Sequence, residues 1–156
     1  MTPKGCHVIG DFKVPDFFVD KIAIVTDGII TDIESTMYYL AMALVGMKAE
    51  ASPPPIPLLG LNVYFLENKS ITFSLDEDVF GCFHQAIIFP VWNWRERGLT
   101  SETMLVVMVE ELCHAVWLIP DGPLIEEKVR EIFEQRPDQF SPDFVTNVYK
   151  RIDQMT

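Results

Sequence analysis

The chain has 156 residues and a hydrophobic content of 49%, which excludes intrinsic disorder and is enough for one domain with a packed core. Its formal net charge of −11 argues against nucleic-acid binding, because binding to phosphates needs clustered Lys and Arg, and the basic residues here are scattered. The odd number of cysteines and the absence of an apolar run long enough to span a bilayer lead us to expect a cytoplasmic protein that does not contact membrane.

The first third of the chain predicts a strand followed by a helix. The apolar run KIAIVT at 21–26 is typical of a strand, and apolar residues at helical spacing predict a helix over 31–47. Thr31 and Glu34 have the spacing of a capping box, in which each side chain accepts from the backbone amide of the other residue. The prolines of SPPPIP at 52–57 exclude helix there, and we interpret this segment as a connector inside a single domain.

The middle of the chain predicts β-structure. Alternating β-formers on both sides of Glu-Asn-Lys-Ser predict a hairpin over 61–75, and a further apolar run predicts a strand at 85–89. The sequence WNWRERG at 92–98 is interpreted as a loop rich in aromatic and cationic side chains. These elements together predict a small, mostly antiparallel sheet.

The remainder of the chain is predicted to be helical. Thr100 or Ser101 caps a helix that runs to about residue 118, and Pro123 suits the first position of a helix over 124–135. Ser141 is the expected cap of a last amphipathic helix, which can pack internally or form the face of a homodimer. The predicted fold is therefore α+β, with helices packed against one face of the sheet.

Two glutamates and one histidine interrupt the most apolar predicted helix. From residue 104 to residue 119 every side chain is apolar except those of Glu110, Glu111 and His114. A helix this apolar should be enclosed by the protein, and burial of an ionised carboxylate without a partner costs several kcal/mol. The sources of compensation that the sequence leaves open are His114, open water, a bound cation, and a distant guanidinium such as that of Arg95 or Arg97.

Helical spacing brings these three side chains together. Glu110 and His114 are four residues apart and Glu111 and His114 are three apart, so all three converge on one face of the helix. A helical turn of this kind can offer two ligands to a metal ion and an adjacent carboxylate as a base.

The stretch TSETMLVVMVEELCHAVWLIPDGPLIEEKV resembles the active-site region of zincin-type metallopeptidases, whose helix carries His-Glu-x-x-His. Glu111 and His114 match the Glu and the second His of that motif, whereas Glu110 stands where a zincin has its first His. The resemblance implies a zincin-like organisation in which Glu110 and His114 bind the metal ion and Glu111 acts as the base. It also implies a third ligand from the next helix, where Glu126 or Glu127 occupies a plausible position.

The replacement of the first motif histidine changes what this resemblance implies about activity. A site of Glu110, His114 and Glu126 has one nitrogen and two oxygen ligands, a harder set than is usual for zinc, and it suits Mn²⁺ or Fe²⁺ as readily as Zn²⁺. We therefore expect a degenerate metal site and a pseudoenzyme that is weakly active or inactive as a hydrolase.

Other residues allow a function of a different kind. Trp92, Trp94 and Arg95 could line a ligand cleft, so the alternative is a non-catalytic protein that binds a small ligand or a protein partner there or through its last helix. Each cysteine also lies within two residues of a histidine, and a zinc site drawn from Cys82, His84, Cys113 and His114 is conceivable, although the spacing matches no zinc finger or ribbon. Buried free cysteines that pack as small apolar side chains are the alternative interpretation.

Overall fold

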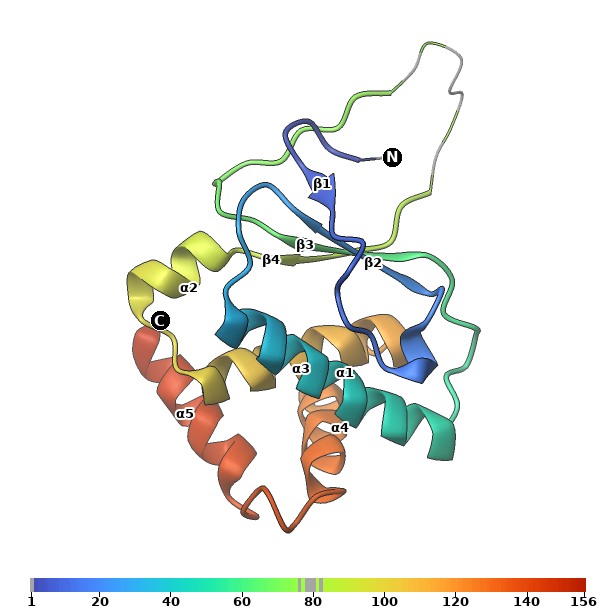
Figure 1. Ribbon diagram of the computed structural model, residues 1–156. Coiled ribbons are helices and arrows are strands. Elements are labelled where there is room, and N and C mark those ends of the chain that lie inside the picture. Colours follow the sequence, from blue (N-terminus) through green and yellow to red (C-terminus); the bar gives the residue numbers. More distant parts are fainter. Residues whose placement is uncertain (1, 76, 78–80, 82) are drawn as a thin grey trace.

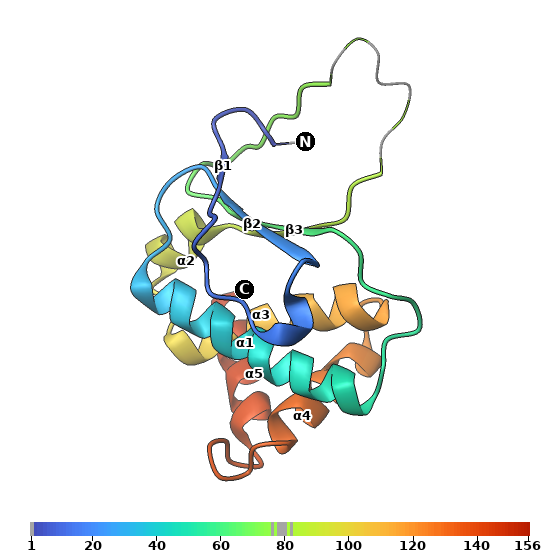
Figure 2. The same cartoon turned by 45° about the vertical axis from the view of Figure 1, so that its right-hand side comes forward.

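The computed structural model describes residues 2–75, 77, 81 and 83–156 and has an α+β fold. Helices lie on one side of a sheet: α1 and α3 run next to it, and α4 and α5 lie farther away, beyond α3 (Figures 1 and 2). The elements in chain order are β1 (His7–Val8), the 3-10 helix η1 (Asp16–Phe18), β2 (Ile22–Thr26), α1 (Asp32–Ala51), β3 (Leu61–Phe65), β4 (Ala86–Phe89), α2 (Val91–Arg97), α3 (Ser101–Trp117), α4 (Pro123–Glu134) and α5 (Phe144–Met155).

The sheet is mostly parallel, which corrects the predicted antiparallel sheet. Its strand order is β1-β2-β3-β4; β1 pairs antiparallel with β2, whereas β2–β3 and β3–β4 are parallel pairs. The predicted hairpin over 61–75 is wrong: β3 ends at Phe65, and its partners are β2 and β4. Parallel pairing follows from the crossover of α1, which returns the chain to the edge at which β2 began.

The helix boundaries agree with the sequence signals in three cases and differ in two. The Thr31–Glu34 capping box is present, Thr100 caps α3, and Pro123 is the first residue of α4. The segment WNWRERG is helical rather than a loop: α2 has Pro90 at its N-cap and Gly98 at its C-cap, where φ is a left-handed 61°. The last helix also begins later than predicted, with Asp143 rather than Ser141 in the cap position.

One large apolar core joins the sheet to all five α-helices. Strands β2 to β4 contribute alternate side chains, among them Ile24, Val63 and Phe89, and α3 contributes a row of residues that are almost completely buried. A smaller cluster of Val25, Tyr64 and Leu66 packs on the opposite face of the sheet. The core therefore encloses α3 except along the face that carries the two glutamates and the histidine, which are half-buried.

None of the helices in the described part of the chain is both long enough and apolar enough to traverse a lipid bilayer. The proline-rich segment 52–57 lies between α1 and β3, where Trp117 Nε1 of α3 donates a hydrogen bond to the carbonyl of Ser52 over 3.0 Å. The first residue of this segment is therefore tied to α3.

Candidate metal centre

Three ionisable side chains in the second half of α3 form one compact group, which we call the Glu110 group. Glu110, Glu111 and His114 each present a possible ligand atom, and these three atoms lie within 4.8 Å of one another. Two ligands on opposite sides of a divalent cation lie about 4–5 Å apart, since each metal–ligand distance is about 2.0–2.6 Å. The separations in this group are therefore compatible with a shared ion.

Glu110 is compensated by a phenol rather than by a cation. The hydroxyl of Tyr149, on α5, donates a hydrogen bond to Oε2 of Glu110. Burial raises the pKa of Tyr149 above its ordinary value, and the hydrogen bond to the carboxylate raises this pKa further. Tyr149 therefore remains a protonated donor, and the second carboxylate oxygen of Glu110, Oε1, is left for another partner.

His114 is oriented by the chain that follows α3. Its Nδ1 lies 2.5 Å from the carbonyl oxygen of Ile119, and because a carbonyl can only accept, Nδ1 carries the proton in this contact. In the neutral imidazole this leaves a lone pair on Nε2, the atom that lies 3.4 Å from Oδ1 of Asp121. Histidines that bind metals commonly donate their other N–H to a backbone carbonyl in this way.

Glu111 is the group member with a perturbed carboxyl. Burial raises the pKa of Glu111 above its usual range, the charges of Glu110 and Asp121 raise it too, and His114 acts in the opposite direction. A carboxyl with a raised pKa is poised to take up a proton, and a bound cation would favour its ionised form. This property suits a ligand or a base.

Glu126 does not belong to this compact group. The Glu126 carboxylate is 56% exposed, and it lies 3.9 Å from the guanidinium of Arg130, one turn farther along α4. Glu127, the other candidate from sequence, is an exposed residue of the same helix. Asp121 is the acidic residue after α3 that contacts the imidazole.

Arg95 compensates a different pair of carboxylates. The hypothesis that Arg95 or Arg97 neutralises Glu110 and Glu111 is wrong, because both arginines bind other residues. The guanidinium of Arg95 lies 2.6 Å from Oε1 of Glu34, a side chain only 1% exposed, and it also pairs with Glu67. Arg97 instead donates to Asn93 and to the carbonyl of Met155.

The aromatic residues of α2 serve mainly as packing. Trp94 is a core residue against Phe89, with ring centroids 5.2 Å apart, and Lys69 lies over the ring of Trp92. With the ion pairs of Arg95, each of the three side chains has a partner within the protein, and a role for them in ligand binding stays a prediction. The last helix, α5, is amphipathic as expected and packs its buried residues Val145 and Val148 into the core.

The proposed cysteine–histidine zinc site gains no support from the described residues. Cys82 lies outside them; Cys113 is buried, and this burial raises the pKa of its thiol. Nε2 of His84 lies 2.5 Å from the hydroxyl of Tyr64, on the face of the sheet opposite the main core.

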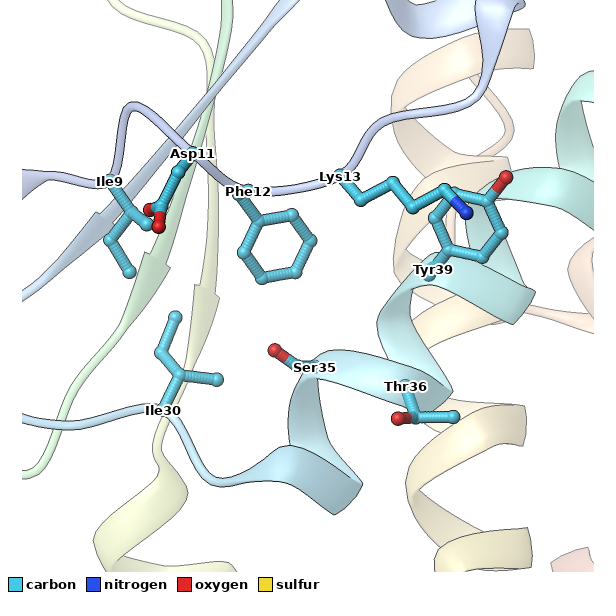
Figure 3. A pocket seen from close by; sticks show the side chains of 8 residues that line it. All are labelled: Ile9, Asp11, Phe12, Lys13, Ile30, Ser35, Thr36 and Tyr39. Atoms are coloured by element: carbon cyan, nitrogen blue, oxygen red, sulfur yellow. The ribbon is translucent and has the colours of Figure 1, made fainter.

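A hollow of about 440 Å³ lies between the segment after β1 and the first turns of α1 (Figure 3). It is lined by apolar, hydroxyl and oppositely charged side chains: Ile9, Asp11, Phe12, Lys13, Ile30, Ser35, Thr36 and Tyr39. Figure 3 shows the Lys13 chain extending beside the Tyr39 ring, and its ammonium lies 4.9 Å from the ring centroid. No residue of the Glu110 group takes part in this hollow.

Comparison of the chain with protein-family models, curated proteins and solved structures gave no match. The chemistry of the Glu110 group therefore rests on the geometry described above. Sequence spacing did not reveal Tyr149, Asp121 or the carbonyl of Ile119. Tyr149 reaches the group from α5, and the other two reach it through the path of the loop after α3.

Proposed function

We propose that the protein binds a divalent cation at Glu110, Glu111 and His114, and that it is a degenerate, zincin-like protein with weak or no hydrolase activity. The observation that carries the proposal is the convergence of the three ligand atoms within 4.8 Å on the half-buried face of α3. A cation there would neutralise carboxylates for which the described residues provide a phenol and an imidazole but no guanidinium or ammonium.

The donor set supports an ion such as Mn²⁺, Fe²⁺ or Zn²⁺. One imidazole and two carboxylates combine a borderline nitrogen ligand with hard oxygen ligands, and such sets accept several first-row divalent ions. The Nδ1 contact to Ile119 supports metal binding too, since it leaves the Nε2 lone pair of His114 available without a change of tautomer.

The same arrangement supports weak or absent hydrolysis. In the zincin-like assignment Glu111 is the base, and a base must stay free of the ion to accept a proton from water. Here Glu111 shares one set of converging ligand atoms with His114 and with Glu110, the residue at the position of the missing first histidine. If Glu111 binds the ion, no second carboxylate of this turn is left as the base, because Glu110 is also a ligand and accepts from Tyr149.

The experiment is a calorimetric titration of untagged, metal-free protein with Mn²⁺ and Zn²⁺, which measures the affinity and the number of ions bound. We expect one ion per chain, and loss of binding in His114→Ala. Glu127→Gln is the control. It removes one negative charge from an exposed position on α4, outside the group. Equal binding by the wild type and His114→Ala would refute the proposal, and so would the absence of binding in the wild type.

A further inference from the structure

We infer that Asp121 is an additional ligand of the cation site, supplied by the loop between α3 and α4; this inference rests on the proposed function. The zincin resemblance assigns that role to Glu126, whereas the contacts favour a residue five positions earlier. The proposal adds a ligand that lies outside the helical turn and outside the three-residue group.

The loop folds back over the imidazole at the end of α3. Leu118 adopts a left-handed φ of 56°, and Gly122 has a φ of 134°, so the chain reverses within five residues. This reversal brings the carbonyl of Ile119 to Nδ1 of His114 and the carboxylate of Asp121 to Nε2 of the same ring. Both nitrogens of one side chain are therefore contacted by a single short loop.

A proton or a metal ion on Nε2 would make the contact with Asp121 attractive. With its proton on Nδ1, the neutral ring presents a lone pair at Nε2, and the carboxylate oxygen 3.4 Å away presents another. Two such atoms repel each other unless a proton or a cation lies between them. A metal ion bound at Nε2 at about 2.1 Å would be close enough to Oδ1 of Asp121 to be bound by it as well.

Asp121 is also free to take this position, whereas Glu126 has another partner. The side chain of Asp121 is 99% exposed, and in the described part of the chain its carboxylate pairs with His114 alone. Glu126 lies by the guanidinium of Arg130.

The test compares Asp121→Asn with Glu126→Gln, two substitutions that each remove one negative charge from the same surroundings. Both variants and the wild type are titrated with Mn²⁺ and Zn²⁺, and the absorption spectrum of the Co²⁺-loaded forms is recorded, since that spectrum reports on the ligand set. Thermal unfolding of the metal-free proteins checks that both variants fold.

We expect Asp121→Asn to weaken binding by tenfold or more, which is about the smallest loss seen for residues that support metal ligands, and to change the Co²⁺ spectrum. Glu126→Gln should leave both unchanged. Unaltered binding in Asp121→Asn would overturn the inference while the proposed function stands. An equal loss in the two variants with an unchanged spectrum would also overturn it, because that result reports only general electrostatic attraction. Absence of binding in the wild type would overturn both proposals.

Discussion

Two acidic clusters of this protein differ in how their buried or half-buried carboxylates are neutralised. In the first, the buried carboxylate of Glu34 is neutralised by the guanidinium of Arg95, which also holds Glu67 and the carbonyl of Ile29. In the second, Glu110 and Glu111 have the phenol of Tyr149 and the imidazole of His114 nearby. The first cluster contains its own cation, so its charges have a structural use. Among the residues that the structure describes, the second cluster has hydrogen-bond donors but no ion pair with Lys or Arg, and this makes it the better candidate for an external ion.

The position of each cluster in the fold agrees with this distinction. The Arg95 cluster joins the first turn of α1 to α2, and Glu34 also accepts from the backbone amide of Thr31. Most of its hydrogen-bonding groups are therefore satisfied by protein. The Glu110 group lies on the half-buried face of α3, next to a loop whose aspartate is exposed, so an ion can reach it from solvent.

The largest expected effect concerns the Arg95 cluster. Arg95→Met should lower the free energy of unfolding by about 3 kcal/mol, because it leaves Glu34 buried without a cation. Arg97→Met is the matched control on the same helix; its donors reach an exposed amide and a terminal carbonyl, so the loss should stay below about 1 kcal/mol. Denaturant unfolding measures both, and equal losses would show that Arg95 has no special structural role.

The next effect concerns the Glu110 group and an added ion. A divalent cation present at about 100 times its Kd should raise the free energy of unfolding by about 2.7 kcal/mol, since it binds only the folded chain. His114→Ala should not respond, whereas folded Arg95→Met should respond like the wild type, because its substitution lies in the other cluster. The same stabilisation in His114→Ala would mean that the ion binds elsewhere.

A smaller effect is expected from the phenol that takes the place of a cation. Tyr149→Phe should cost about 1.5 kcal/mol, the scale of a hydrogen bond to a charged acceptor, because Glu110 loses its donor. Tyr38→Phe is an informative control: the Tyr38 hydroxyl is buried without a hydrogen-bond partner in the described structure, so its removal should not destabilise the protein. If both variants lose stability equally, the Tyr149 hydrogen bond is not what stabilises the region.

Local signals in the sequence predicted much of the secondary structure but not the pairing of the strands. The capping box at Thr31 and the proline that begins α4 depend on neighbouring residues, and both are present. The parallel pairing of β3 depends on where α1 crosses the sheet, which alternation of β-formers along 61–75 cannot reveal. Pro90 and Gly98 are residues that commonly flank a helix, but the aromatic and charged composition between them favoured the interpretation of a loop.

The candidate site shows the same division between local and tertiary information. Spacing of three and four residues predicted that Glu110, Glu111 and His114 converge, because a helical turn fixes that geometry. The partner of Glu110 comes from α5, 39 residues away in sequence, so no local pattern could identify Tyr149. Arg95 was one of several sources of compensation that the sequence left open for Glu110 and Glu111, and the structure pairs it with Glu34 and Glu67 instead.

The smallest effect concerns Glu111 in the metal-free protein. Its pKa is raised from the ordinary value of 4.5, mainly by burial, so the folded chain binds this proton more tightly than the unfolded chain does. Ionisation of Glu111 therefore opposes folding above the raised pKa. This cost is absent below the ordinary pKa, where Glu111 is protonated in both the folded and the unfolded chain. Glu111→Gln should accordingly stabilise the chelator-treated protein at pH 7 by less than about 1 kcal/mol, because solvent screens the half-exposed carboxylate. This gain should vanish as the pH falls below the ordinary value. Glu127→Gln should show no such pH-dependent gain, because its side chain is exposed on α4. Urea unfolding at several pH values measures the difference. A loss of stability at pH 7 in Glu111→Gln would mean that the ionised carboxylate already has a stabilising partner within the protein. That result would remove the reason to expect an external cation.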